Sequence, residues 1–527
     1  MTNGQNVVTR FEHMQSVRDP LVHIYQDCFD LTLPIRGEGF YSLDYSSTGA
    51  AHKQRRILDN TATRSLRDQV SQLQDGLTPE QVQWFDLYLN DSTDDDKRWL
   101  SNAAKVMWES FNASNFASES MECLIDLGVA GWFVLYIFED EFKQVQFEHW
   151  PLAQCFIAST RRDKRIDTIY RKFPLTAAQA KHEYGDEIPQ NIREALNNNK
   201  FNEVFWFLQA IEPREIFAVG AKLGRNMPFA SYHVELSSKK VVRESGYHEF
   251  PCAVPRWLSV PASPYAVGPT YEAFGDIGSV NEIKRLELAN LDIAVGGMFV
   301  GVNDGILNPR TVRLGAKRMV MAASTDSIKP LVTGTDFRTA YISEDRIQEQ
   351  IKQTFNANNL PPLDGQPRTA LEISERMNIV RKLQGPIYSR STSEYLQPAI
   401  ERVFGLNFRA GKLGDPPQSL VNRNFSVRYL SPIARAQRQE ESNAIKRFVA
   451  NAIEVSPVFP QALDTVDIDQ AQFLVGEIDG VPDAVIRKGK KLIEHRQRLA
   501  QAQAEAQNRA AAEEVLVEGG KKRIAQA

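Results

Sequence analysis

The stretch YEAFGDIGSVNEIKRLELANLDIAV, residues 271–295, decides the fold. It contains no proline, and charged residues separate its apolar ones, as they do in an amphipathic helix. The apolar residues recur at helical spacing: Val280, Ile283, Leu286, Ala289 and Ile293. Gly296 and Gly297 follow directly, and glycines often end a helix because they adopt the left-handed backbone at little cost. We therefore predict a long helix that ends near residue 295.

A β-rich insert follows this helix, and a second helix comes after the insert. Residues 298–340 alternate short runs of Val, Met and Leu with glycines and an Asn-Pro turn, which is typical of short strands. The next helix is predicted from Ser343 to about Asn356. A compact β-rich module is thus inserted between two helices.

Helices are also expected in the first third of the chain. Apolar spacing predicts them over residues 65–73, over residues 79–89, and from residue 99 to residue 127, where Gly128 would end the third. The buried stripe of the second would consist of Val82, Phe85 and Leu89.

Strands follow these helices. Runs rich in aromatic and β-branched residues predict a small antiparallel sheet over residues 132–137, 145–150, 155–159 and 166–173. A basic cluster, residues 161–165, lies between the last two and would be a hairpin tip. After a short helix from Thr176, further strands are predicted over residues 204–211, 230–236 and 241–244.

Beyond the second helix of the insert the pattern is again mostly helical. Residues 356–365 have the composition of a loop, rich in Asn and Pro. The remaining predictions are a long, kinked helix over residues 369–404, a Gly/Pro stretch over 405–417, a strand over 425–430, and helices over 434–452 and 485–517.

Composition limits the function classes. The 527 residues include 62 Lys and Arg against 66 Asp and Glu, a net charge of −4, which excludes a strongly basic nucleic-acid-binding domain. The four cysteines are far apart in the sequence, and we interpret them as core thiols of a protein that is kept reduced. The polar N-terminus and the absence of a long apolar run predict a soluble chain that is neither exported nor inserted in a membrane.

No catalytic motif has usable spacing. The sequence lacks the Gly-rich phosphate loop of a packaging ATPase, and its eight histidines are scattered, so His149 and His233 are interpreted as packing or hydrogen-bonding residues. The run Asp94-Asp95-Asp96 is interpreted as the solvated start of a helix, in preference to a metal site. We expect no enzyme activity, no cofactor and no metal.

Several strings, taken in order, resemble the portal, or head-to-tail connector, proteins of short-tailed double-stranded DNA bacteriophages. The first half of the chain contributes Ser47-Thr48-Gly49, Gly76-Leu77-Thr78-Pro79 followed by Trp84-Phe85, Pro151-Leu152, and Phe173-Pro174-Leu175-Thr176. The second half contributes Gly246-Tyr247-His248-Glu249-Phe250-Pro251 followed by Pro255-Arg256-Trp257, Arg368-Thr369-Ala370-Leu371-Glu372-Ile373, and Tyr429-Leu430-Ser431-Pro432. No single string is specific, but the ordered set spans nearly the whole chain.

The resemblance implies an α+β multidomain fold, mainly helical, with wing, stem, clip and crown around a central channel. It assigns residues 1–270 to the wing, 271–297 to stem helix 1, 298–340 to the clip, 341–357 to stem helix 2, 358–367 to the tunnel loop, 368–430 to a long helix that returns to the wing, and 431–527 to a helical crown. The expected function is a ring at one capsid vertex through which double-stranded DNA is packaged and ejected.

The resemblance also implies candidate sites. The tunnel loop and DNA channel would include Asn356, Asn358, Asn359, Leu360, Pro361, Pro362, Leu363, Asp364, Gln366 and Arg368. The clip would dock other proteins through Arg310, Arg313, Lys317 and Arg318, although a contact between subunits explains this basic cluster equally well. Stem candidates are Lys284, Arg285, Arg346 and Lys352.

The expected partners follow from the same resemblance. They are about eleven further copies in a ring of twelve, double-stranded DNA bound without sequence specificity, the terminase, a tail adaptor protein, and the major capsid, scaffolding and internal core proteins. The protein would be assembled in the host cytoplasm and reside at the portal vertex of the virion. A ring-forming tail adaptor or head-completion protein is the alternative, and a packaging ATPase is disfavoured because the phosphate loop is missing.

Overall fold

The computed structural model describes residues 3–40, 47–80, 82–89, 93–218, 220, 222–296, 299–301, 328–330, 337–357, 385–420, 426–430, 432–455, 457, 459–478, 492, 495–498 and 501. The chain divides into two compact units, Met1–Ser431 and Pro432–Ala527. Helices predominate and several small sheets accompany them, as the mainly helical α+β prediction requires.

Unit 1 contains a five-stranded antiparallel sheet. Its strands lie in chain order: β4 (Cys155–Ala158), β5 (Thr168–Thr176), β6 (Val204–Pro213), β7 (Phe229–Glu235) and β8 (Lys240–Tyr247). The structure thus confirms these five strands. The small sheet predicted over residues 132–173 is divided, because its first two strands belong to a different sheet.

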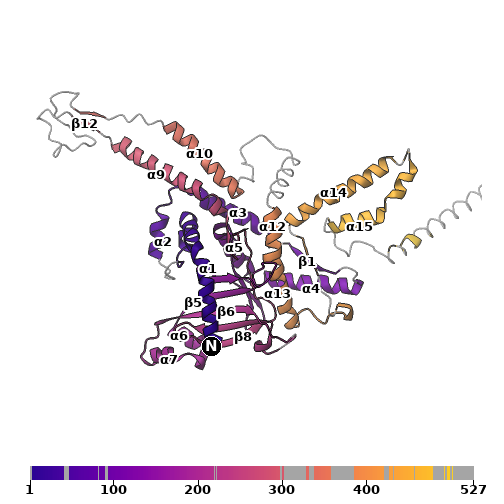
Figure 1. Cartoon of the computed structure of the whole chain (residues 1–527). Coiled ribbons are helices and arrows are strands. Elements are labelled where there is room, and N and C mark those ends of the chain that lie inside the picture. The colour runs from indigo at the N-terminus through magenta and orange to yellow at the C-terminus, as the bar shows by residue number, and fades with distance from the viewer. Residues whose placement is uncertain are drawn as a thin grey trace, which may run out of the picture. The chain divides into compact units, whose positions relative to one another are not determined.

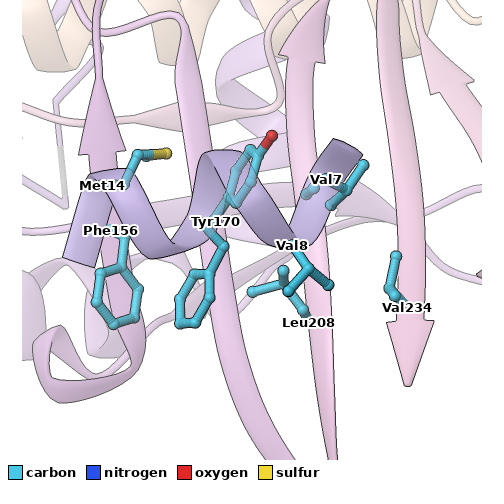
Figure 2. Close-up of a cluster of buried hydrophobic side chains, with 9 residues drawn as sticks. Val7, Val8, Met14, Phe156, Tyr170, Leu208 and Val234 are labelled. Carbon is cyan, nitrogen blue, oxygen red and sulfur yellow. The ribbon is translucent and has the colours of Figure 1, made fainter. Parts of the chain in front are cut away.

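Helix α1 (Asn3–Thr32) covers one face of this sheet (Figures 1 and 2). Its apolar residues Val7, Val8 and Met14 pack on side chains from four strands, and the whole cluster is buried. The strand residues are Phe156, Tyr170, Leu208 and Val234 (Figure 2). Our sequence predictions contain no counterpart of α1.

Helices α6 (Ala177–Tyr184) and α7 (Gln190–Asn197) pack in a second buried cluster with Phe207 of β6 and Val242 of β8. The start of α6 at Thr176 is confirmed, because the Thr176 hydroxyl accepts a hydrogen bond from the Gln179 backbone N–H. In return, the Gln179 side chain accepts one from the Thr176 N–H, which completes a capping box.

A second sheet, in the order β3–β2–β9, joins β2 (Leu135–Glu139), β3 (Val145–His149) and β9 (Cys252–Ala253). An aromatic core beside it contains Trp84, Phe111, Phe116, Phe147 and Tyr395, whose rings stack or meet edge to face. Helices α3 (Thr61–Leu77), α4 (Asp94–Asn112) and α5 (Phe116–Ala130) complete this part of unit 1.

The helix predicted over residues 79–89 is wrong. Residues Phe85–Tyr88 form strand β1, which pairs antiparallel with β14 (Ser426–Tyr429), and Val82 is exposed. Phe85 and Leu87 are buried, so the alternation of a strand outweighs the helical spacing once a partner strand is available.

The helix predicted over residues 99–127 is two helices, because α4 ends at Asn112 and α5 begins at Phe116. Gly128 does not end the second one. It lies inside α5, where a Cβ would collide with the Leu66 side chain of α3, and the helix ends instead at Gly131, whose φ is +83°. The Asp94-Asp95-Asp96 run does start α4, and Thr93 and Asp96 form its capping box.

The helix predicted to end at residue 404 continues to Arg409 as α13 (Gln397–Arg409), after α12 (Gly385–Ser391) and a π-helical turn, Thr392–Leu396. Gly405 therefore lies within a helix and not in a Gly/Pro stretch, and a Cβ there would collide with the Glu249 carboxylate. Residues 369–384 of this prediction lie outside the described residues.

Apart from two long helices and the strands between them, which are described below, the other elements of unit 1 are short. They are the helical segments η1 (Pro34–Arg36), α2 (Ser47–Gln54), η2 (Leu152–Gln154), η3 (Gly185–Glu187), η4 (Gly224–Asn226), α8 (Pro269–Glu272) and η7 (Gln418–Leu420), and the paired strands β10 (Leu258–Ser259) and β11 (Ala266–Val267).

Unit 2 contains α14 (Pro432–Val455), η8 (Pro460–Thr465) and α15 (Ile468–Ile478). Helix α14 confirms the helix predicted over residues 434–452, whereas α15 was not predicted. Most of the helix predicted over residues 485–517 lies outside the described residues.

Candidate functional site: the paired helices α9 and α10

Two helices lie side by side in unit 1 and carry the insert between them (Figure 1). They are α9 (Phe274–Gly296) and α10 (Phe337–Thr354). The insert begins with β12 (Phe299–Gly301), which pairs antiparallel with β13 (Ile328–Pro330). The predicted order of helix, β-strands and helix is therefore present, although α10 begins six residues before the predicted Ser343.

Apolar residues anchor the N-terminal end of α9 and the C-terminal end of α10. Ile277 and Val280 of α9 are buried, and so are Ile351 of α10 and Phe355 just beyond it. Helix α10 also contacts α3. Full burial of one such side chain stabilises a fold by about 1.5–3 kcal/mol, so these ends are firmly attached to the core of unit 1.

A lysine links the two helices. The Lys284 ammonium lies 2.5 Å from Glu344 Oε1 on α10 and 3.2 Å from Glu287 Oε2 on its own helix. The hydrogen bond to Glu344 raises the pKa of Lys284, with a smaller contribution from Glu287. Because Glu344 is buried, its charge needs this partner.

Polar side chains join the helix pair to the segment before α3. Gln348 on α10 donates hydrogen bonds to Asp59 Oδ2, at 2.8 Å, and to Glu344 Oε1, at 3.0 Å. On α9, Asn281 Oδ1 accepts hydrogen bonds from the backbone N–H groups of Leu58, at 2.9 Å, and Asp59, at 3.1 Å. We call Asp59, Asn281, Lys284, Glu344 and Gln348 the polar joint.

Further along the pair, large aliphatic side chains are exposed. Leu286, Leu288 and Leu291 of α9 expose between 48% and 55% of their surface, and Ile342 of α10 exposes 64%. Solvent-exposed leucines at this density are typical of a surface that another molecule covers.

The stem candidates therefore have different surroundings. Lys284 belongs to the polar joint, while Arg285 is exposed and forms a bidentate pair with Glu282 on its own helix. Lys352 lies 3.9 Å from Glu349 on the same helix, and Arg346 is exposed.

Most tunnel-loop and clip candidates lie outside the described residues. Asn356 is described: it follows α10 with φ at +54°, and its backbone N–H donates to the Gln353 carbonyl at 3.0 Å. The candidates outside are Asn358, Asn359, Leu360, Pro361, Pro362, Leu363, Asp364, Gln366 and Arg368 of the loop and Arg310, Arg313, Lys317 and Arg318 of the clip, so their roles stay predictions.

Of the polar joint, only Lys284 was a candidate from the sequence, and no pattern pointed to the other four residues: Asp59, Asn281, Glu344 and Gln348. Asp59 and Gln348 are 289 positions apart, and no local pattern indicates that they meet. The histidine interpretation is confirmed, since His149 bonds to Asp126 and His233 to Tyr184. All four cysteines are buried and free, and burial raises the pKa of Cys28 and of Cys155 to about 12.

Among the described residues, no cluster of three or more His, Cys, Asp or Glu side chains could hold a metal ion. In the same part of the chain, no helix is long and apolar enough to cross a membrane.

The chain is similar to two phage proteins over most of its length. It is 26% identical to the probable portal protein of Bordetella phage BPP-1 over 519 residues, which cover 96% of this chain and 93% of that one. It is 25% identical to the portal protein of Salmonella phage epsilon15 over 541 aligned positions, covering 97% of this chain and 94% of that one.

Chains from solved structures of gene transfer agent particles also match parts of this chain. A chain from the neck of an empty particle matches 75% of this chain and 88% of its own length with a TM-score of 0.36 and 12% identity. A chain from the virion of a native particle matches 78% and 93%, with the same TM-score and identity. The sequence model of one family, described as the bacteriophage head to tail connecting protein, matches residues 5–486. Since that match spans most of the 527 residues, the chain belongs to the family of bacteriophage head to tail connecting proteins.

Proposed function

We propose that this protein is a portal protein, which forms a ring of about twelve subunits at one vertex of a phage capsid. Double-stranded DNA enters and leaves the capsid through the ring, and the protein performs no catalysis of its own. Membership of the connecting-protein family and similarity to two phage portal proteins over more than nine-tenths of the chain support this function.

The exposed aliphatic residues of α9 and α10 are the observation that carries the ring. Leu286, Leu288 and Leu291 find no cover within the described part of the subunit, and burial against a neighbour would add about 25 cal/mol for each Å² of apolar surface removed from water. In a closed ring every subunit has a neighbour on both sides, so each copy gains the same contact.

In this proposal α9 and α10 are the stem, the insert that starts at β12 is the clip, and residues 358–367 are the tunnel loop. The region before the stem is the wing, together with the segment that returns to it after the tunnel loop. Residues 431–527 are the crown. The polar joint then has a mechanical role, because it fastens the stem to the wing at the place where force from moving DNA would be transmitted.

The charges of the stem suit a conduit in which DNA slides. Lys284 and Arg285 are paired with Glu344 and Glu282, so they offer little free positive charge to phosphate. Each phosphate that a protein neutralises adds salt-dependent affinity, which would retard the passage of DNA. The net charge of −4 per chain agrees with weak contact that has no sequence specificity.

The clip would present Arg310, Arg313, Lys317 and Arg318 to the terminase during packaging and to a tail adaptor afterwards. Major capsid, scaffolding and internal core proteins are the further partners of the proposed ring. A positive band repeated around a ring attracts acidic surfaces and loses that attraction as salt screens it. The protein would be assembled in the host cytoplasm and end in the virion.

The test is the mass and the image of the purified assembly. A portal is expected to give a closed ring of about twelve subunits with a projecting stem by electron microscopy, and about twelve times the 59.6 kDa chain mass by light scattering. A monomer that persists at micromolar concentration in several salt conditions would refute the proposal. A ring without a projecting stem would favour the tail-adaptor alternative.

A further inference from the structure

The contacts between α9 and α10 show which of their residues lie at the same level. Lys284 of α9 meets Glu344 of α10, and Asp59 bonds both to Asn281 of α9 and to Gln348 of α10. The insert joins the far ends of the two helices, which therefore run antiparallel (Figure 1). A step forward along α9 thus matches an equal step backward along α10, because every α-helix rises by about 1.5 Å per residue.

The same contacts show which residues point away from the helix pair. A step of two residues turns an α-helix by about 200°, so the residues two positions before and after the linked lysine and glutamate face outwards. They are Glu282 and Leu286 on α9, and Ile342 and Arg346 on α10. All four are exposed, as this geometry requires. We call the sides on which they lie the outer faces of α9 and α10.

The two outer faces match each other level by level. Leu286 lies at the level of Ile342, and Glu282 lies at the level of Arg346. An aliphatic side chain thus corresponds to an aliphatic one, and a carboxylate corresponds to a guanidinium. The faces are on opposite sides of the helix pair, so these residues cannot meet within one chain.

The charges on the outer faces leave one cation without a partner. Arg285 pairs with Glu282 on α9, and Lys352 lies 3.9 Å from Glu349 on α10. Arg346 has no ion-pair partner within the described part of the chain. A carboxylate can accept from two cations at once, so Glu282 can bind a second arginine without releasing the first.

Two glycines continue the outer face of α9 towards its buried end. Gly275 and Gly278 precede Glu282 by seven and four residues, which is the spacing of one helix face. A Cβ at either position would meet nothing within 4 Å, so no contact inside the described part of the chain requires a glycine there. Glycine weakens a helix relative to alanine, and the close approach of another helix is a reason to retain it.

A closed ring brings the two faces together. Each copy is turned onto the next about the ring axis without moving along it, and the two surfaces that meet are different ones. If the helix pairs run along that axis, residues that meet across the contact lie at the same level.

We propose that the outer face of α10 in one copy packs on the outer face of α9 in the next, with Leu286 against Ile342 and Glu282 paired with Arg346. The inference rests on the proposed ring and identifies its contact surfaces. The aliphatic pair supplies buried apolar area, while the ion pair at its edge fixes the register of the two helices.

The test is disulfide formation in the full chain with Leu286→Cys and Ile342→Cys combined. All four native cysteines are buried, so mild oxidation with diamide acts on the introduced pair. A non-reducing gel is expected to show a ladder of linked chains. Each single variant should stay unlinked, because position 286 does not meet position 286 of the next copy in a head-to-tail contact. Ile216→Cys with Ile342→Cys is the control and should give no ladder, since Ile216 is exposed outside both helices.

Light scattering on the same samples separates this inference from the proposed function. Rings of normal mass that give no ladder would overturn the paired faces and leave the ring standing. Linked dimers from either single variant would show a two-fold contact instead of a head-to-tail one. Absence of rings in the parent protein would refute both proposals.

A charge exchange tests the ion pair. Glu282→Arg is expected to raise the concentration at half assembly roughly two- to fivefold, because it brings the new arginine beside Arg346 of the next copy. Adding Arg346→Glu should restore assembly. Within one chain the two positions are on opposite sides of the helix pair, so such a rescue can arise only between copies. If the second change does not restore assembly, Glu282 and Arg346 do not pair.

Discussion

Arg256 and Glu394 form a buried ion pair, although they are 138 positions apart in the chain. Arg256 Nη2 lies 2.6 Å from Glu394 Oε1, and both Arg256 Nε and its backbone N–H donate to Oε2 at 3.1 Å. Both side chains are nearly inaccessible. The pair ties the proline-rich segment before α9 to the π-helical turn Thr392–Leu396, which carries Tyr395 into the aromatic core.

Glu394→Ala is expected to lower the free energy of unfolding of unit 1 by about 3–5 kcal/mol, because it leaves the Arg256 charge buried without a partner. Urea denaturation followed by tryptophan fluorescence measures the change. The matched control is Glu282→Ala, which breaks the exposed pair with Arg285 and should change the unfolding curve little. Similar effects of the two variants would contradict the role given to burial.

Acid should destabilise the five-stranded sheet of unit 1 through His233 on β7. Its pKa is about 4 in the folded protein, because burial and nearby arginines oppose protonation, against 6.5 as its ordinary value. Below pH 6.5 the unfolded chain binds a proton that the folded chain does not, so stability falls between pH 6.5 and pH 4, by up to about 3 kcal/mol. His233→Gln should flatten this part of the pH profile of the urea midpoint, and an unchanged slope would contradict the assignment.

Gly131→Ala is expected to be strongly destabilising, by about 3 kcal/mol or more. Gly131 has a φ of +83°, and a Cβ there would collide with the backbone of Val267, so both conformational strain and overlap oppose the change. Gly411→Ala is the control, since Gly411 has a similar φ of +74° but open space around it. It should cost only about 1–2 kcal/mol. Equal melting temperatures of the two variants would show that the close approach to Val267 is unimportant.

Replacing Leu288 and Leu291 together by Gln should weaken ring assembly and leave the fold of the subunit intact. Both side chains are about half exposed in the single chain, so the change removes apolar surface that we propose a neighbouring subunit covers. Light scattering should show a shift towards monomer at micromolar concentration, with an unchanged circular dichroism spectrum. Ile216→Gln, at an exposed position outside α9 and α10, should assemble normally. Rings of normal mass from the double variant would exclude these leucines from the interface.

The basic residues of the proposed clip should matter for docking more than for stability. Changing Arg310, Arg313, Lys317 and Arg318 to Gln is expected to leave melting and ring formation nearly unchanged and to weaken attachment of the terminase or tail adaptor, measured by co-sedimentation at two salt concentrations. A matched control changes the basic turn between β4 and β5: Arg161, Arg162, Lys164 and Arg165. If the clip variant fails to form rings, the cluster belongs to the subunit interface instead.

Helix starts could be predicted from sequence where the residues that specify them lie within one or two helical turns of each other. The start of α4 follows from Thr93 and the acidic run after it, and the start of α6 from Thr176 and Gln179, because a capping box needs only residues three positions apart. Helix α1 also carried such a signal, since Val7, Phe11 and Met14 recur at helical spacing, yet we predicted no helix there.

The candidate site was predictable only in part. The amphipathic pattern of residues 271–295 and the turn-rich insert after it indicated two helices with a β-module between them, and family resemblance gave that unit its proposed role. Neither the sequence pattern nor the resemblance indicated that Lys284 pairs with Glu344 on the other helix, or that Asp59 meets Gln348.

By itself, the sequence determined the strands β4 to β8, the helices α9 and α10, and the family, because these depend on short patterns and on an ordered set of strings. Only the tertiary structure decided that Phe85–Tyr88 is a strand, that α5 continues past Gly128, and that Gln209 lies buried between Arg171 and His233. The reason is physical: strand pairing, close glycine contacts and buried polar rows each depend on a partner far away in the chain, and the free energy of such contacts outweighs the local preference of the residues that make them.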